Sequence, residues 1–120
     1  MSVDEIFKTV MATFRYTSDR AQFNTDDYWQ TLEELDMNGG LGDCEDAAAA
    51  FVHKLRENGH TARFVLCLTE DSDAHLVAET EGQILCNRQT QVLPLDRLNY
   101  RWLACSGDKP GMPWRRIVSA

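Results

Sequence analysis

Cys44 and His75 have the residue types and settings that nucleophilic catalysis requires. Cys44 lies at the beginning of the run DCEDAAAAF, in which a capping acid and four alanines predict the first turns of a helix. A helix N-terminus and a nearby imidazole both lower the pKa of a thiol. His75 begins an apolar strand pattern, whereas His53 falls on a helix and His60 in the loop that follows it. We therefore expect Cys44 as the nucleophile and His75 as its partner.

Three acidic residues flank this cysteine: Asp43, Glu45 and Asp46. Carboxylates in the first turn of a helix are stabilised by the helix dipole. However, three carboxylates beside a thiolate oppose its ionisation, and a bound cation would relieve that conflict. The sequence leaves two roles open for these acids, helix capping and cation binding.

The elements that would position these groups follow from hydrophobic periodicity. Helical spacing of apolar residues predicts helices over residues 3–15, after the cap at 25–27, and from 44 to the Asn58-Gly59 stop. After Gly59 the period becomes that of strands, with candidate strands at 62–68, 75–78, 83–86 and 100–105. Helices that precede strands indicate an α+β fold with a mostly antiparallel sheet. The length of 120 residues suits a single domain, residues 1–120.

Composition excludes several classes of function. A formal net charge of −7 argues against nucleic-acid binding, which needs a basic surface. The N-terminus has neither the basic nor the apolar region of a signal peptide, and no apolar run is long enough to span a membrane. We expect a cytoplasmic protein without a membrane partner. The four cysteines contain no CxxC pair, so we expect free thiols and no structural zinc.

Several segments together are more specific than composition. They are GDCEDAA at 42–48, FRYTSD at 14–19, DYWQTLEE at 27–34, HLV at 75–77, LCNR at 85–88, VLP at 92–94 and NYRW at 99–102. In this set the chain resembles the bacterial transglutaminase-like cysteine peptidases, whose hallmark is a Gly-Asp-Cys-Glu-Asp motif. The resemblance implies a papain/transglutaminase-like core, in which N-terminal helices and a central cysteine-bearing helix pack on the sheet.

The resemblance also implies catalytic roles. Cys44 would be the nucleophile and His75 the general base and acid, while an aspartate in the family's Leu-Asp-Asn segment orients the imidazole. Here Cys86 stands at that third position, and a thiol is a weaker acceptor than a carboxylate. Asn87 is the alternative orienter. An even-numbered turn before residue 83 would place Cys86 on the face of His75, and an odd-numbered turn would place Asn87 there. Glu79 shares that face as a weaker candidate.

The same resemblance suggests further binding groups. The backbone N–H of Cys44 is a natural oxyanion-hole donor, and Gln30 or the indole of Trp29 could supply a second. Some family members bind calcium through acids of this motif, which implies Asp43, Glu45 and Asp46 as ligands.

These expectations define a function and two alternatives. The first is a cysteine hydrolase, a peptidase that acts on a protein or peptide substrate. Acyl transfer to an amine, as in transglutaminases, uses the same site. The second alternative is a catalytically weakened member that serves as a binding or assembly module, for instance in a phage or mobile element. The loss of the aspartate at position 86 motivates it.

Overall fold

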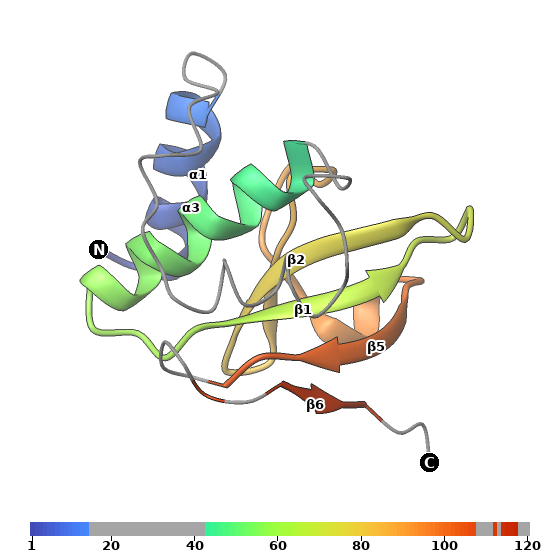
Figure 1. Ribbon diagram of the computed structural model, residues 1–120. Coiled ribbons are helices and arrows are strands. Elements are labelled where there is room, and N and C mark those ends of the chain that lie inside the picture. The colour runs from blue at the N-terminus through green and yellow to red at the C-terminus, as the bar shows by residue number, and fades with distance from the viewer. Residues whose placement is uncertain (15–42, 108–111, 113, 118–120) are drawn as a thin grey trace.

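The computed structural model of the protein describes residues 1–14, 43–107, 112 and 114–117. Within these residues, helices α1 and α3 pack on one face of a six-stranded sheet (Figure 1). The helices are α1 (Val3–Phe14), α3 (Asp43–Glu57) and the 3-10 helix η2 (Leu95–Arg97); the strands are β1 (Arg63–Leu68), β2 (Ala74–Thr80), β3 (Gln83–Leu85), β4 (Leu93–Pro94), β5 (Arg101–Cys105) and β6 (Arg115–Arg116).

The sheet has the strand order β4-β3-β2-β1-β5-β6, and each neighbouring pair is antiparallel. The predicted α+β class and antiparallel sheet are confirmed. The four predicted strands are present, with ends that differ by at most two residues. Strands β4 and β6 and helix η2 were not predicted, because segments of two or three residues carry no readable period. The helix expected after residues 25–27 lies outside the described residues.

Helix α1 begins with a capping box. The backbone N–H of Glu5 donates to the Ser2 hydroxyl at 3.2 Å, and the Glu5 carboxylate accepts from the backbone N–H of Ser2 at 3.2 Å. The buried stripe of α1 includes Phe7, whose ring stacks on Phe51 of α3 with centroids 5.5 Å apart. This contact fixes the two helices against each other.

Helix α3 is the central helix that the alanine run predicted. Its alanines at 47–50 are all buried, and their small size allows α1 and the sheet to approach closely. The helix ends in a Schellman motif, in which His60 N–H donates to the carbonyl of Leu55 and Gly59 N–H to that of Arg56. Gly59 adopts the required positive φ of 82°. No helix among the described residues is long and apolar enough to cross a membrane.

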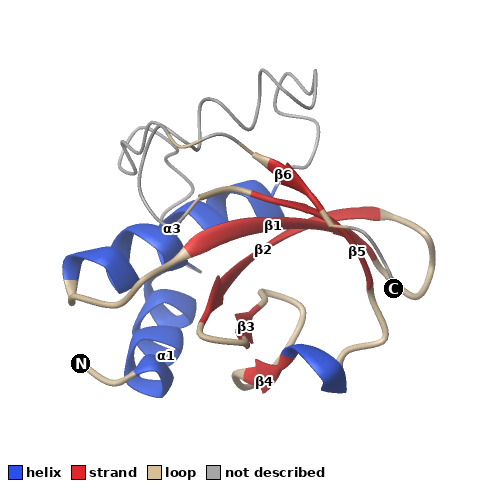
Figure 2. Cartoon of the chain, turned by 90° about the horizontal axis from the view of Figure 1, so that it is seen from below, coloured by secondary structure: helices blue, strands red, loops and turns tan. Residues whose placement is uncertain are grey.

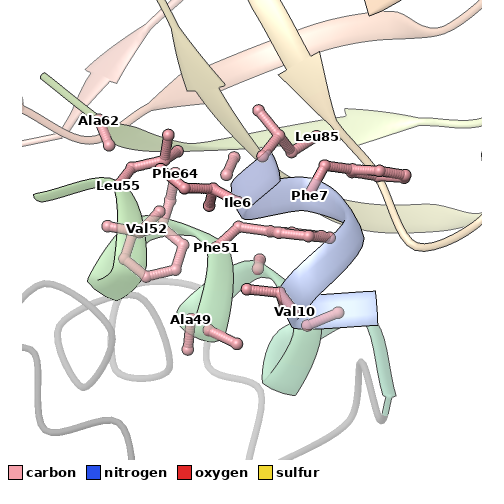
Figure 3. Packing of buried hydrophobic residues seen from close by; sticks show 14 of the residues in the cluster. Ile6, Phe7, Val10, Ala49, Phe51, Val52, Leu55, Ala62, Phe64 and Leu85 are labelled. Atoms are coloured by element: carbon pink, nitrogen blue, oxygen red, sulfur yellow. The ribbon is translucent and has the colours of Figure 1, made fainter. Parts of the chain in front are cut away.

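The two faces of the sheet are covered differently. On the helix-covered face, Phe64, Leu76, Ala78 and Leu85 pack with α1 and α3 (Figure 3). On the other, which we call the second face, the buried residues are Val65, Cys67, Val77, Ile84, Cys86, Tyr100 and Cys105. Leu95 and Leu98 pack against this second set. Figure 2 shows why: after β4 the chain forms η2 and then crosses to β5.

Candidate active site

His75 and Cys86 meet on the second face. Strands β2 and β3 are joined by the two-residue turn Glu81-Gly82, whose φ values of 49° and 85° suit a tight hairpin. The register pairs Ala78 with Leu85, so the residue after β3 lies on the same face as His75. The His75 Nε2 is 3.1 Å from the Cys86 sulfur, and both side chains are buried. The even-numbered turn therefore brings Cys86 to the imidazole.

Tyr100, the residue before β5, extends this contact. Its hydroxyl lies 3.6 Å from the Cys86 sulfur, and its ring packs edge-on against the His75 ring with centroids 5.9 Å apart. Two further side chains donate to the same hydroxyl: Arg88 Nη1 at 3.4 Å and Gln89 Nε2 at 3.2 Å. The imidazole thus ends a chain of polar contacts that begins at the surface.

A turn directs these two donors. The backbone N–H of Gln89 donates to the carbonyl of Cys86 at 3.1 Å, so the chain reverses directly after the cysteine. The Arg88 guanidinium donates through Nη2 to the Glu70 carboxylate at 2.9 Å. Because this ion pair is partly exposed it contributes little stability, but it fixes the position of Arg88 beside the Tyr100 ring.

Burial determines the charge of these groups. It lowers the pKa of His75 to about 4; the positive charge of Arg88 lowers it further and Glu70 opposes this. Burial also raises the pKa of Cys86, and it raises the pKa of Tyr100 to about 12. At neutral pH the pair is therefore a neutral imidazole and a neutral thiol. A carboxylate in place of Cys86 would instead favour the imidazolium.

Cys44 is the second residue of α3, which begins at Asp43. The sequence predicted Asp43 as the cap before the helix, so the observed start is one residue earlier. Figure 1 shows that α3 begins at the end of the sheet where β1 ends and β2 begins, which is the end that carries His75. The side chains of Asp43, Cys44 and Glu45 lie outside the described residues, as does any contact between Cys44 and His75.

The imidazole lies on the face that α3 does not cover. Side chains alternate along β2, and Leu76 packs with α3 while its neighbours His75 and Val77 face the other way. Ala74, the first residue of β2 and the neighbour of His75, is exposed.

The other candidate orienters do not contact the ring. Asn87 follows Cys86, and its side-chain oxygen is buried without a hydrogen-bond partner among the described residues. Glu79 shares the face of His75 but pairs with Arg63, whose guanidinium donates to it at 3.1 and 3.3 Å. Of the three candidates, the structure brings only Cys86 to His75.

The predicted oxyanion donors Gln30 and Trp29 lie outside the described residues. Of the predicted calcium ligands Asp43, Glu45 and Asp46, only the Asp46 side chain is described, and it is buried. The described residues contain no group of three His, Cys, Asp or Glu side chains that could hold a metal. Since calcium takes six to eight oxygen ligands, one placed carboxylate does not make a site, and calcium stays a prediction.

Three residues of this site were missed by sequence reasoning: Tyr100, Arg88 and Gln89. The first two belong to segments, NYRW and LCNR, that carried the family resemblance but received no role. The signal that could have found them is the position of Arg88 and Gln89 directly after Cys86. Tyr100 precedes β5, which is not a neighbour of β3 in the sheet. Only the folded structure therefore shows that Tyr100 lies beside Cys86.

The fold and the site define an α+β core in which a helix-opening cysteine and a strand histidine lie at one end of an antiparallel sheet. A model of the transglutaminase-like superfamily matches residues 2–105, and the chain belongs to that superfamily.

Two solved structures of LapG from Legionella pneumophila are similar in fold. The EGTA-treated one aligns with 98% of this chain at a TM-score of 0.65 and 20% identity, and the other with 87% at 0.55 and 24%. The chain spans 66% and 65% of their respective lengths. The comparison with curated proteins gave no match.

Proposed function

We propose that the protein is a cysteine hydrolase that cleaves protein or peptide substrates, with Cys44 as nucleophile and His75 as general base and acid. The observation that carries this proposal is the Nε2–sulfur contact of His75 with Cys86. One ring nitrogen is held by the residue at the family's orienting position. Nδ1 has no described partner and is the nitrogen left for a nucleophile or a substrate.

The proposed reaction has two stages. The Cys44 sulfur attacks the scissile carbonyl carbon while its proton passes to Nδ1 of His75, and the leaving amine takes that proton as the carbon–nitrogen bond breaks. Water then attacks the thioester with the imidazole as base, which releases the acid and regenerates the thiol. The start of α3 supports the first step because a helix N-terminus stabilises a thiolate. The backbone N–H of Cys44 is the proposed oxyanion donor.

The test identifies which thiol reacts. Wild-type protein is treated with an iodoacetamide-type probe at mildly acidic pH, and the labelled peptide is mapped. We expect the label on Cys44, and we expect its loss in Cys44→Ala but not in Cys86→Ala, because Cys86 is buried with a raised pKa. Labelling of Cys44 no faster than a free thiol would contradict the proposal. Cleavage of a denatured protein substrate by wild type, and not by Cys44→Ala, would extend it to peptidase activity.

The thiol at position 86 favours a second candidate function. In it, the protein is a catalytically weakened member of the superfamily that serves as a binding or assembly module. A neutral thiol cannot stabilise an imidazolium as a carboxylate does. Cys86→Asp discriminates the two: a large gain in Cys44 labelling rate indicates an eroded site, whereas a loss shows that Cys86 has its own function. A primary amine added during turnover tests acyl transfer, because a transglutaminase would incorporate it into the substrate.

Calcium binding by Asp43, Glu45 and Asp46 is a separate proposal. One of the LapG structures is of EGTA-treated protein, and EGTA chelates calcium. Hard carboxylate oxygens at a helix start suit that ion. We expect millimolar calcium to raise the melting temperature, chelator to reverse the rise, and Asp46→Ala to remove it. An unchanged melting temperature would contradict calcium binding.

A further inference from the structure

The hydrogen-bond donors around Tyr100 have fixed directions. A guanidinium and an amide nitrogen can only donate, so the contacts from Arg88 Nη1 and Gln89 Nε2 occupy both lone pairs of the Tyr100 hydroxyl. The hydroxyl proton must then be donated, and the Cys86 sulfur at 3.6 Å is its remaining partner among the described residues. Tyr100 is therefore the donor in this contact.

The direction set at Tyr100 continues to His75. The Cys86 sulfur accepts from Tyr100, and its own proton has Nε2 of His75 at 3.1 Å as the next acceptor. A neutral imidazole carries one proton, and Nε2 is used as an acceptor. We propose that Tyr100, with Arg88 and Gln89, is a positioning group that directs this chain of hydrogen bonds so that His75 carries its proton on Nδ1.

This direction is the reverse of the one a carboxylate would impose. An ionised aspartate at position 86 only accepts, so it would hold a proton on Nε2 and leave Nδ1 as a base. The thiol of Cys86 donates to Nε2 instead, and Nδ1 becomes a donor. Burial keeps both groups neutral at neutral pH, which preserves this arrangement.

The functional consequence rests on the proposed role of His75. With a proton on Nδ1, the ring can donate to a Cys44 thiolate or to a substrate oxygen, but it cannot accept a proton from the Cys44 thiol until the tautomer changes. The resting ring is therefore set to donate from Nδ1, and proton transfer from a Cys44 thiol to His75 requires the other tautomer.

The test reads the tautomer directly. In the 15N-labelled protein at pH 7.5, the two-bond couplings between ring protons and ring nitrogens show which nitrogen of each histidine is protonated. We expect Nδ1–H at His75 in the wild type. A wild-type His75 with its proton on Nε2 would overturn the proposal, and this result needs no variant that might fail to fold.

A near-isosteric variant should reverse the direction of the hydrogen bonds that link Tyr100, Cys86 and His75. In Gln89→Glu the new carboxylate accepts the Tyr100 proton, so the hydroxyl can accept from the Cys86 thiol, and the sulfur can accept from Nε2–H. We expect His75 to change to the Nε2–H tautomer and Cys44 to label at least several-fold faster. Gln83→Glu is the matched control, because it makes the same charge change at an exposed position of β3 and should leave the tautomer unchanged.

The two readouts separate the two proposals. A tautomer that changes in Gln89→Glu without any change in Cys44 labelling supports the hydrogen-bond chain and contradicts the base role of His75. A tautomer that stays on Nδ1 in folded Gln89→Glu contradicts the directing role of Tyr100 and its donors, whatever the labelling rate.

Discussion

The two faces of the sheet carry different kinds of residue although the same strands build both. The helix-covered face is mainly apolar, with Phe64 and Leu76 among its fully buried side chains. The second face buries titratable groups: His75, Cys86 and Tyr100. Neighbouring residues such as Leu76 and His75 therefore belong to different environments. Alternation in β2 separates the residues that stabilise the fold from those that position chemistry.

The second face also holds polar side chains in pairs. Besides the contacts of His75, the Arg63–Glu79 pair is held at 3.1 Å, and Arg63 also donates to the Cys105 sulfur at 3.3 Å. Buried polar groups that keep their partners cost little, whereas a partner removed leaves a desolvation penalty. Substitutions on this face should change protonation more than packing, and those on the other face should do the opposite.

The largest effect is expected where the helices pack against the helix-covered face. Phe51→Ala removes a fully buried ring that stacks on Phe7, and it should lower the free energy of unfolding by about 3–5 kcal/mol. Urea denaturation measures the change, and Phe51→Leu should lose much less because it keeps most of the volume. A loss below about 1 kcal/mol for the alanine variant would show that this face does not hold the fold.

The next largest effect concerns the charge of the second face. Cys86→Asp places an acceptor beside Nε2 and should raise the pKa of His75 from about 4 by at least a unit. An NMR titration of the His75 ring protons measures it, with Cys86→Ser as a neutral control that keeps a small hydroxyl. A pKa that stays near 4 in the aspartate variant would mean that burial outweighs the new charge.

The depressed pKa of His75 also predicts a pH dependence of stability. The unfolded histidine binds a proton below about pH 6.5, whereas the folded one remains neutral down to about 4. His75 therefore contributes stability that is present above pH 6.5 and is lost as the pH falls toward 4, with a slope of at most about 1.4 kcal/mol per unit. His75→Gln should flatten that part of the profile. An unchanged slope would contradict a neutral buried imidazole.

The smallest effects are expected at two turns, one at the end of helix α3 and one in the hairpin that places Cys86 on the second face. Gly59 ends α3 and Gly82 lies in the β2–β3 turn, both at positive φ and with open space where a Cβ atom would lie. Each alanine variant should cost about 1 kcal/mol from backbone conformation alone. Only Gly82→Ala should also shift the His75 NMR signals, because that turn sets the register of Cys86. Equal shifts in both variants would contradict this local control.

The sequence was sufficient for the elements that have a clear period. The alanine run predicted α3, and the strand patterns predicted β1, β2, β3 and β5, because burial on one face imposes regular spacing. The sequence did not decide whether Cys86 or Asn87 faces His75, because the answer depends on whether the turn before residue 83 has an even or an odd number of residues. Nothing local indicated Tyr100, which reaches the site from β5 on the far side of β1 and β2 through a register that shifts between Leu66 and Cys67.

In the proposed reaction, His75 and Cys44 act together at the end of the sheet. The most direct test is the pH dependence of Cys44 alkylation in wild type and in His75→Gln, with the folded state of each verified by circular dichroism. We predict a Cys44 pKa well below the ordinary value of about 8.5 in the wild type, and a shift of at least one unit upward in the variant. Superimposable pH profiles for the two proteins would contradict a joint action of His75 and Cys44.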